Sequence, residues 1–358
     1  MSTACPSSFN LTISYRSRSL KPSRKKYMPD TIYIEQDIVD HPRTLTILER
    51  FPRARRITCE RYGQVFNPRA QNFRLQKRKP ALILARKHDG FVLPAPTGYG
   101  VGGQRNYYFS HMLNCPYDCR YCFLQGMYRS AHQVLFVNYE DFEQAIADRL
   151  RAETGNAWFF SGYDCDSLAY EPVSQFAQGI LPLFARNPDA WLELRTKSVQ
   201  IRGLLATVPL ANVVVAFSFT PEEISRALEH GAPSVPRRIE AMVRLQQQGW
   251  RLGLRFDPLI YQTDYEAQYE RLFEQIFAVI DPRRLHSVSL GPFRLPRAFF
   301  RTLKRLYPDE PLLASPLSDA GGMISYRPDL EQQMTEFCTE SLLRHIPRHI
   351  FFPCTTDA

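Results

Sequence analysis

The segment NYYFSHMLNCPYDCRYCFLQ (Asn106–Gln125) places a short β-rich run directly before three closely spaced cysteines. Cys115, Cys119 and Cys122 form a C-x3-C-x2-C pattern with no fourth cysteine beside it. In α/β barrels the functional residues lie in loops at the carboxyl ends of the strands. The segment therefore predicts the first strand of an α/β sheet, followed by a loop that holds a metal.

From this strand onward, β-rich runs alternate with segments of helical periodicity. The β-rich runs are Asn106–His111, Ala157–Gly162, Ala190–Thr196, Val213–Phe219, Arg251–Phe256 and His286–Gly291. The helical segments are Glu140–Arg151, Pro172–Ala185, Val235–Gln248, Tyr265–Val279 and Pro296–Leu306. Such alternation is typical of βαβ units on a parallel sheet. We therefore predict an α/β fold with a partial (β/α)6 TIM-like barrel; an open doubly wound sheet is the alternative.

The rest of the chain divides around this barrel. Residues 1–27 are predicted to be a flexible basic tail, 28–100 a small N-terminal α/β extension, 101–310 the barrel, and 311–358 a C-terminal segment with one helix near Leu330–Leu343. The longest apolar stretches, such as Ala211–Phe217, have the length of a strand and fall well short of the ~20 residues of a membrane span. No membrane association is expected.

Composition indicates a globular protein, since 44% of the 358 residues are hydrophobic and 23% are charged. The net charge is +9, and basic residues are concentrated between Arg50 and Lys87. A polyanionic partner is one interpretation, and a merely basic solvated surface is the other. The eight cysteines are sparse for the length, which favours a reducing, cytoplasmic setting. Those outside the motif and position 165 receive no predicted role: Cys5, Cys59, Cys338 and Cys354.

The absence of a fourth cysteine beside the motif limits the kind of metal site that it can form. A structural zinc site needs four ligands, and the only additional candidate close to the motif is His111. Three thiolates on one short loop instead suit three corners of a [4Fe–4S] cluster. The fourth iron would then be open to a small molecule, as catalytic metals keep an open position.

The motif, with Tyr121 just before its last cysteine, resembles the radical S-adenosylmethionine (SAM) superfamily. The resemblance implies that SAM binds the open iron and that an electron from the cluster releases a 5′-deoxyadenosyl radical. An electron donor such as flavodoxin or ferredoxin is then expected. The alternative from the residues alone is a zinc knuckle in a non-catalytic, nucleic-acid-binding protein, which would be colourless and stable in air.

Three stretches are similar to the spore photoproduct lyase family: CRYCFLQG (Cys119–Gly126), IYIEQDIVDHPRTLTILERFP (Ile32–Pro52) and RLGLRFDPLIY (Arg251–Tyr261). This resemblance implies repair of a thymine dimer photoproduct in DNA, which fragments to two thymines. It also implies that Cys165 donates a hydrogen atom to the product radical. The polar neighbours of Cys165 predict that its thiol does not lie in an apolar pocket.

The same resemblance implies several contacts to SAM. Lys197 and Ser218 stand at or just beyond predicted strand ends, and Ser167 and Asp257 match further positions of the family's SAM site. Asp257 replaces a small residue there, so a role for its side chain is less secure. Tyr121 matches a family tyrosine near the cluster; a packing ring is the alternative.

The sequence departs from the family at two places. Phe123 stands where the family has a second tyrosine, proposed to return hydrogen toward SAM, and a phenyl ring has no exchangeable hydrogen. SAM is then either consumed or regenerated through another donor. The region 315–329, which corresponds to a basic DNA-binding hairpin in the family, has only Arg327. Basic residues remain near two other segments: Arg69, Phe73–Lys79, Arg86 and Lys87, and, on one predicted helical face, Arg297, Arg301, Lys304 and Arg305.

These departures leave two catalytic hypotheses. The first is a radical SAM lyase that acts on a thymine photoproduct in DNA. The second keeps the radical SAM chemistry but changes the substrate to an RNA base, a peptide or a small metabolite. A steep loss of DNA affinity with added salt distinguishes the first from the second.

Overall fold

The computed structural model describes residues 28–96, 98–152 and 155–354. Its main feature is an eight-stranded sheet in the order β18-β14-β13-β11-β10-β9-β5-β4. All neighbouring strands are parallel except the β4–β5 pair at one edge. The bounds are β4 Leu93–Pro94, β5 Arg105–Phe109, β9 Ala157–Ser161, β10 Ala190–Thr196, β11 Val213–Ser218, β13 Arg251–Leu259, β14 Leu285–Pro292 and β18 Phe351–Pro353.

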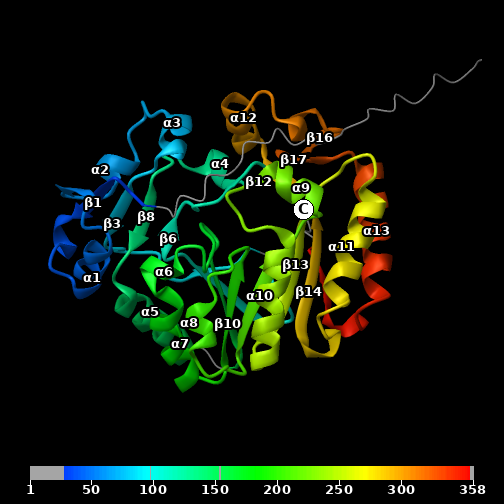
Figure 1. Cartoon of the computed structure of the whole chain (residues 1–358), viewed down its shortest axis with the longest axis horizontal. Coiled ribbons are helices and arrows are strands. Elements are labelled where there is room, and N and C mark those ends of the chain that lie inside the picture. Colours follow the sequence, from blue (N-terminus) through cyan, green and yellow to red (C-terminus); the bar gives the residue numbers. More distant parts are fainter. Residues whose placement is uncertain (1–27, 97, 153–154, 355–358) are drawn as a thin grey trace, which may run out of the picture.

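The six predicted strands therefore form a curled sheet in their sequence order, which confirms the partial (β/α)6 barrel rather than the open doubly wound alternative (Figure 1). The sheet also contains β18, which the sequence analysis missed. Three residues are too few to show a strand pattern, and β18 pairs with β14 from the far C-terminal end of the described chain. The predicted tail at residues 1–27 lies outside the described residues.

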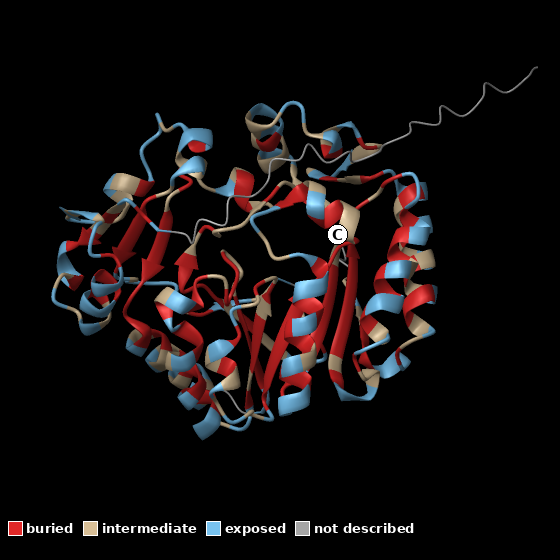
Figure 2. Cartoon of the chain, in the orientation of Figure 1, coloured by how far each residue is buried: buried red, intermediate tan, exposed pale blue. Residues whose placement is uncertain are grey.

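The helices pack on the outside of the barrel because each has one apolar face (Figure 2). All six residues of β11 are buried, which is the pattern of a parallel strand covered on both faces. The predicted helices are present with small changes in their bounds, except that Pro172–Ala185 is divided at Gln175, which has a positive φ, into α6 (Glu171–Ser174) and α7. They are α5 Tyr139–Ala152, α7 Phe176–Arg186, α10 Val235–Gln248, α11 Tyr265–Phe277, α12 Arg297–Leu306 and α13 Pro328–Leu343.

The barrel contains a charged pair that the alternation of strands could not predict. Arg255 on β13 donates to both carboxylate oxygens of Glu193 on β10, at 3.1 and 2.6 Å. Arg255 also donates to the Ser287 hydroxyl at 2.9 Å. Both charged side chains are almost fully buried, so the pair is satisfied within the sheet instead of by water.

A second sheet lies beside the barrel, in the order β2-β1-β3-β8-β6. Its strands are β1 Thr31–Glu35, β2 Arg55–Cys59, β3 Leu82–Ala85, β6 Met112–Leu113 and β8 Gln133–Phe136. The accompanying helices are α1 Pro42–Arg50, α2 Gly63–Phe66 and α3 Phe73–Arg78. Because β6 and β8 follow residue 100, this sheet takes strands from both sides of the predicted domain boundary, which remains a prediction.

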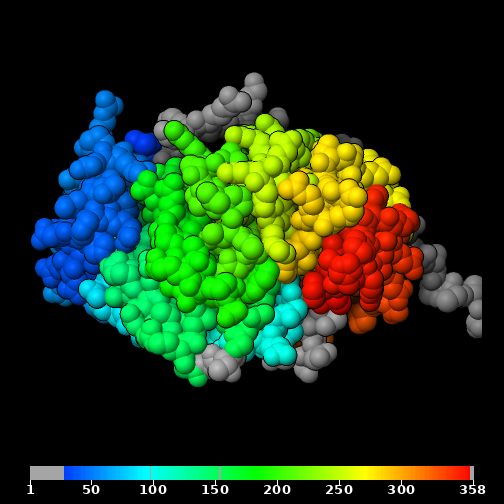
Figure 3. Space-filling model, turned by 90° about the horizontal axis from the view of Figure 1, so that it is seen from below, coloured from blue at the N-terminus to red at the C-terminus, as the bar shows by residue number. Residues whose placement is uncertain are grey.

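The C-terminal segment contains the predicted helix as α13 and a small antiparallel sheet. In this sheet β17 (Met323–Tyr326) pairs with β15 (Arg294–Pro296) and with β16 (Leu317–Ala320). Gly321 and Gly322, both with positive φ, form the turn between β16 and β17. Figure 3 shows the N-terminal extension in blue at one end of the molecule and the C-terminal region in red toward the other. Within the described residues, no helix is long and apolar enough to cross a membrane.

Candidate active site

The three cysteines lie between the end of β5 and α4 (Leu124–Met127), on the loop that the sequence predicted. Burial raises the pKa of all three thiols, to about 12 for Cys115. For Cys119, the thiols of Cys122 and Cys115 raise the pKa further. The loop thus carries one buried and two half-buried thiols within eight residues, which a bound metal would stabilise as thiolates.

This donor set fits a cluster better than a single ion. In the described part of the chain, no three His, Cys, Asp or Glu side chains converge to hold one metal ion. Each cysteine of a [4Fe–4S] cluster binds a different iron, so such convergence is not required. The positive charges of Lys197 and Lys77 lower the pKa of Cys122 and so favour its thiolate. Residues Cys115, Cys119 and Cys122 are therefore suited to three corners of a cluster.

The cysteine loop is tied to the barrel by backbone hydrogen bonds. Strand β7 (Asp118–Cys119) pairs antiparallel with β12 (Glu229–His230), so that Cys119 lies opposite Glu229. The Arg120 amide donates to the Leu228 carbonyl at 2.8 Å. Since β12 follows α9 (Glu222–Leu228), which in turn follows β11, these bonds fix the cysteines relative to the carboxyl ends of the barrel strands.

A buried carboxylate lies beneath the loop. Glu229 accepts from the Tyr121 hydroxyl, from Arg238 on α10, and from Ser225 Oγ at 2.7 Å. Burial alone would raise the pKa of Glu229, but Arg238 and Lys197 lower it to about 2. Arg238 also donates to the Ser218 carbonyl at 3.1 Å. Glu229 is therefore ionised, and it joins the cysteine loop to the end of β11.

Lys197 reaches this network from the end of β10. Its Nζ lies 3.8 Å from Glu229 Oε1 and 5.4 Å from the centroid of the Tyr121 ring. Burial would lower the pKa of Lys197, yet Glu229 and the Cys119 thiol hold it above its ordinary value. A buried ammonium next to the cysteine loop can bind a ligand carboxylate, provided that the ligand competes with Glu229.

The loop after β9 carries Cys165, and Asp166 organises it. Asp166 accepts from Thr196 Oγ1 at 2.6 Å and from the Lys197 amide at 2.6 Å, as well as from two amides of its own loop. Ser167, a predicted SAM contact, is buried and donates its hydroxyl to the Ser161 carbonyl at 3.0 Å. Asp166 thus connects the loop that carries Cys165 to the residue that follows β10.

The Cys165 thiol is buried and close to the cysteine motif. Charge on Cys115 raises the pKa of Cys165, in addition to the larger effect of burial. Its sulfur lies 4.0 Å from His111 Nδ1, and the His111 ring stacks on Phe176 with the centroids 3.8 Å apart. Burial lowers the pKa of His111 to about 3, so the imidazole is neutral.

The prediction that the polar neighbours of Cys165 would keep it out of an apolar environment is wrong. Cys165 packs in a hydrophobic cluster with Met112, Leu135 and Tyr170. The loop turns the side chains of Asp164 and Asp166 toward hydrogen-bonding partners, and the thiol between them points to the apolar cluster. A thiol with few polar partners keeps its hydrogen, because burial disfavours the thiolate.

Two further predicted SAM contacts occupy different positions. Ser218 is buried at the last position of β11. Asp257 lies on β13, and one of its carboxylate oxygens accepts from Arg195 Nη2 at 3.1 Å. Arg195 also donates to the Tyr99 hydroxyl at 3.1 Å. The structure therefore brings Ser218 to the Glu229 network through its carbonyl and places Asp257 in a separate ion pair.

Glu229, Arg238 and Asp166 are the residues that sequence reasoning missed. Asp166 carried a weak signal, since an acidic residue just past a strand end is a common site residue. Glu229 and Arg238 carried none, because Tyr121 and Glu229 are 108 residues apart in the chain and nothing local indicates their contact.

Comparison with known proteins adds a family and a fold. The sequence model of a family described as spore photoproduct lyase matches residues 27–312. The curated spore photoproduct lyase of Bacillus subtilis (strain 168) is 23% identical over 294 residues, which cover 79% of this chain and 83% of that protein. A solved cysteine-to-serine mutant of spore photoproduct lyase superposes with a TM-score of 0.79 at 16% identity, covering 92% of this chain and 99% of the other.

A second solved structure is a mutant spore photoproduct lyase with bound AdoMet and dinucleoside spore photoproduct. It matches with a TM-score of 0.78 at 16% identity, over 92% of this chain and 99% of that chain. At these identities the structural likeness establishes the fold alone, a partial β/α barrel.

Proposed function

Because the chain belongs to the spore photoproduct lyase family, we propose that it is a radical SAM lyase that reverses a thymine dimer photoproduct in DNA. The observation that carries this proposal is the position of the buried Cys165 thiol, whose sulfur lies 4.0 Å from Nδ1 of His111, four residues before Cys115. Family membership implies a [4Fe–4S] cluster and SAM as cofactors. The three thiols of the motif form a donor set that suits that cluster.

When bound, the cluster and SAM supply a 5′-deoxyadenosyl radical, and the residues of this chain position and complete the reaction. Cys115, Cys119 and Cys122 hold the iron. Lys197, with its ammonium near the motif, is suited to the carboxylate of SAM. Ser167 and Ser218 are proposed as further polar contacts, both buried at the same edge of the sheet.

Cys165 has the state that hydrogen-atom donation requires. Burial raises the pKa of its thiol well above the ordinary value, so the sulfur keeps its hydrogen at neutral pH. A carbon-centred radical on the substrate takes that hydrogen atom, which leaves a thiyl radical on Cys165. The buried surroundings, with Met112 and Tyr170, exclude water from this step. Tyr121 is committed to Glu229, so we assign it a positioning role beneath the motif.

The test is reconstitution of the cluster under anaerobic conditions, followed by incubation with dithionite, SAM and the dinucleotide photoproduct. We expect release of thymine-containing product together with 5′-deoxyadenosine. Formation of 5′-deoxyadenosine without product would reject this substrate and retain the enzyme class. A preparation that contains zinc and neither iron nor sulfide would reject the class as well.

A second candidate keeps the radical chemistry and changes the substrate to an RNA base, a peptide or a small metabolite. It is favoured by the β16–β17 hairpin, where Asp319 forms an ion pair with Arg297 of α12 and so neutralises one of the predicted cations. Steep salt dependence of DNA binding supports the first candidate, whereas weak binding that does not respond to salt supports the second.

We further propose a cytoplasmic setting and an electron donor of the flavodoxin or ferredoxin type. The support is chemical: the seven cysteines that the structure describes are all free thiols, and an oxygen-sensitive cluster needs a reducing environment. Replacing dithionite by reduced flavodoxin, with its reductase and NADPH, should sustain SAM cleavage. No cleavage with either flavodoxin or ferredoxin would reject this pair of donors.

A further inference from the structure

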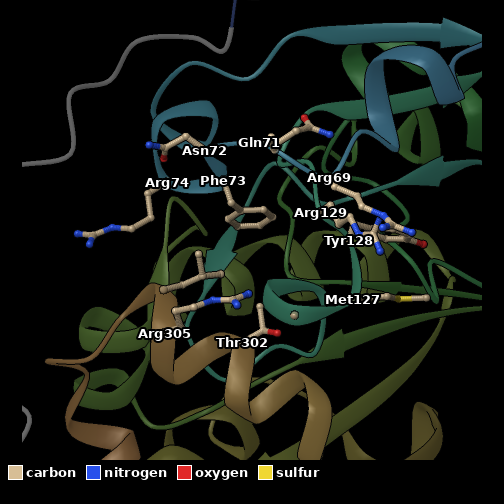
Figure 4. A pocket seen from close by; sticks show the side chains of 13 residues that line it. Arg69, Gln71, Asn72, Phe73, Arg74, Met127, Tyr128, Arg129, Thr302 and Arg305 are labelled. Atoms are coloured by element: carbon tan, nitrogen blue, oxygen red, sulfur yellow. The ribbon is translucent and has the colours of Figure 1, made fainter.

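A groove of about 740 Å³ runs between the N-terminal extension, α4 and α12. Its lining includes four arginines from three segments that are far apart in the sequence. They are Arg69 and Arg74 from the region around α3, Arg129 after α4, and Arg305 on α12. Figure 4 shows Arg69 and Arg129 gathered at one end of the groove, Arg74 at the other, and Arg305 from the helix on the opposite side.

The charge of this groove is uncompensated. All four arginines are exposed, and among the described residues that line the groove none is Asp or Glu. None of the four forms an ion pair with a residue that the structure describes; Arg74 only lies over the Tyr307 ring, at 6.0 Å. Some other exposed arginines do form ion pairs, such as Arg226 with Glu222 at 2.7 Å and Arg344 with Glu270 at 2.7 Å. Four unpaired like charges in one groove favour an anionic ligand.

The groove has a fixed position relative to the active site. Its wall includes Gly126 in α4, four residues after Cys122. A Cβ at Gly126 would lie 2.7 Å from the backbone of Phe299, so α4 and α12 are in close contact there. A ligand in the groove is therefore next to the loop that carries the cysteine motif.

The lining also fits the chemistry of a nucleic-acid strand. Guanidinium groups bind phosphate oxygens in pairs, and amide side chains such as Gln71 and Asn72 bind phosphate or sugar oxygens. The half-buried ring of Tyr128 lies at the same surface and can stack on a base, whereas Phe73 is buried. Because the arginines come from three separate segments, they can contact more than one phosphate of a strand.

From these observations we propose that the groove binds the phosphodiester backbone of the nucleic-acid strand that carries the lesion. This inference rests on the proposed function. It assigns to the groove the contribution that the hairpin at 315–329 cannot make, since Arg327 is its only basic residue. Of the predicted basic face of α12, Arg305 lines the groove, while Arg297 is bound to Asp319.

The test uses the reconstituted enzyme and the double variant Arg74→Gln/Arg305→Gln. The matched control is Arg151→Gln/Arg186→Gln, which removes the same charge at the C-terminal ends of α5 and α7, where each arginine pairs with an acid. These helix ends lie opposite the carboxyl ends of the strands. We measure binding of a fluorescent thymine-rich oligonucleotide by anisotropy between about 50 and 200 mM salt.

We expect the groove variant to lose about tenfold or more in affinity at the lowest salt and to have a salt slope smaller by about one to two. The control should bind like the wild type. Iron content after reconstitution should match the wild type in both variants, because none of these arginines belongs to the cysteine motif. Wild-type affinity in the groove variant would overturn the inference.

Two further outcomes separate this inference from others. If poly-glutamate displaces the oligonucleotide from the groove at equal charge concentration, the groove is a docking site for an acidic protein and the inference is wrong. If the wild type binds the oligonucleotide through the groove but releases no product from the photoproduct, the groove assignment holds for nucleic acid and the proposed function fails. The two proposals are therefore tested independently.

Discussion

The Tyr121 hydroxyl donates a hydrogen bond to the Glu229 carboxylate, which joins the middle of the cysteine motif to a strand that pairs with it. The carboxylate also accepts from buried Arg238 and lies 3.8 Å from Lys197 Nζ. One acidic residue thus neutralises two buried cations and positions the aromatic residue that precedes Cys122. We therefore expect the stability of the site to depend strongly on the Glu229 carboxylate.

We predict that Glu229→Gln lowers the free energy of unfolding by about 3–5 kcal/mol, because it leaves the buried Arg238 guanidinium without a counterion. The measurement is urea unfolding of the cluster-free protein. The matched control is Glu222→Gln, which removes the exposed partner of Arg226 and should cost less than about 1 kcal/mol. Equal effects of the two substitutions would contradict the assigned role.

Replacing the proposed hydrogen donor should separate SAM cleavage from repair. In Cys165→Ala we expect 5′-deoxyadenosine to form as in the wild type, while thymine release falls at least about tenfold, a barrier increase of roughly 1.4 kcal/mol. The control is Cys338→Ala, which removes another buried cysteine, on α13. Iron content and cluster absorbance should be unchanged in both variants. Full repair by Cys165→Ala would remove Cys165 from the mechanism.

The ring of Phe123 packs against Tyr163, with the ring centroids 5.7 Å apart, and it carries no exchangeable hydrogen. We therefore expect the wild type to consume SAM stoichiometrically, with one 5′-deoxyadenosine per lesion repaired. Phe123→Tyr should lower that ratio by restoring a hydroxyl at this position. The ratio is measured by chromatography of both products. Catalytic use of SAM by the wild type would show that another residue serves as donor.

The contact between α4 and α12 depends on the missing side chain of Gly126. A methyl group there would lie 2.7 Å from the Cα and carbonyl oxygen of Phe299, which are backbone atoms and cannot rotate away. Gly126→Ala should therefore destabilise the protein by about 1–3 kcal/mol. It should also weaken oligonucleotide binding, because α12 carries Arg305. Gly63→Ala, where the added methyl meets only the Asn67 side chain, is the control and should change stability by less than about 1 kcal/mol.

Glu171 gives a pH dependence that can be predicted in sign. Burial raises its pKa from 4.5 to about 7, while the amides of Ala177 and Gln178 oppose that shift. The folded state then holds its proton more tightly than the unfolded chain. Its contribution is fully present below pH 4.5 and is lost as pH rises through about 7, by up to about 3 kcal/mol.

Glu171→Gln keeps an oxygen that can accept from the Ala177 amide and removes the ionisation. The variant should match the wild type in unfolding free energy near pH 5 and exceed it near pH 8. Thermal or urea unfolding across this range measures the difference. A constant difference between the two proteins at all pH values would show that Glu171 does not titrate in this window.

The barrel could be predicted from the sequence because its six central strands are short β-rich runs that alternate with segments of helical periodicity. Val213–Ser218 is an example in which every residue is buried. The short strands could not be found in this way, since β18 and β8 gain their structure from pairing with distant partners, β14 and β3. The local sequence pattern therefore predicts strands with many apolar residues. It misses short strands that are defined by pairing with a distant segment.

At the site, the cysteine spacing was sufficient to predict that the three thiols share one loop, because the eight residues Cys115–Cys122 carry all of them. The prediction that Cys165 avoids apolar surroundings failed because the neighbours in sequence, Asp164 and Asp166, point to other partners. The ion pair between Glu229 and Arg238 could not be predicted. Glu229 lies between α9 and α10 and Arg238 lies on α10, so their contact depends on the folded geometry. The roles of Ser167, Lys197, Ser218 and Asp257 remain predictions.

The short β7–β12 ladder has a consequence for how the inorganic centre is assembled. The amide of Arg120 and the backbone of Cys119 are held by the α9–β12 region. If these bonds form in the metal-free protein, cluster insertion requires delivery of iron and sulfide but no refolding of this part of the loop. Exchange of the Arg120 amide with deuterium should accordingly be slow even before any metal arrives.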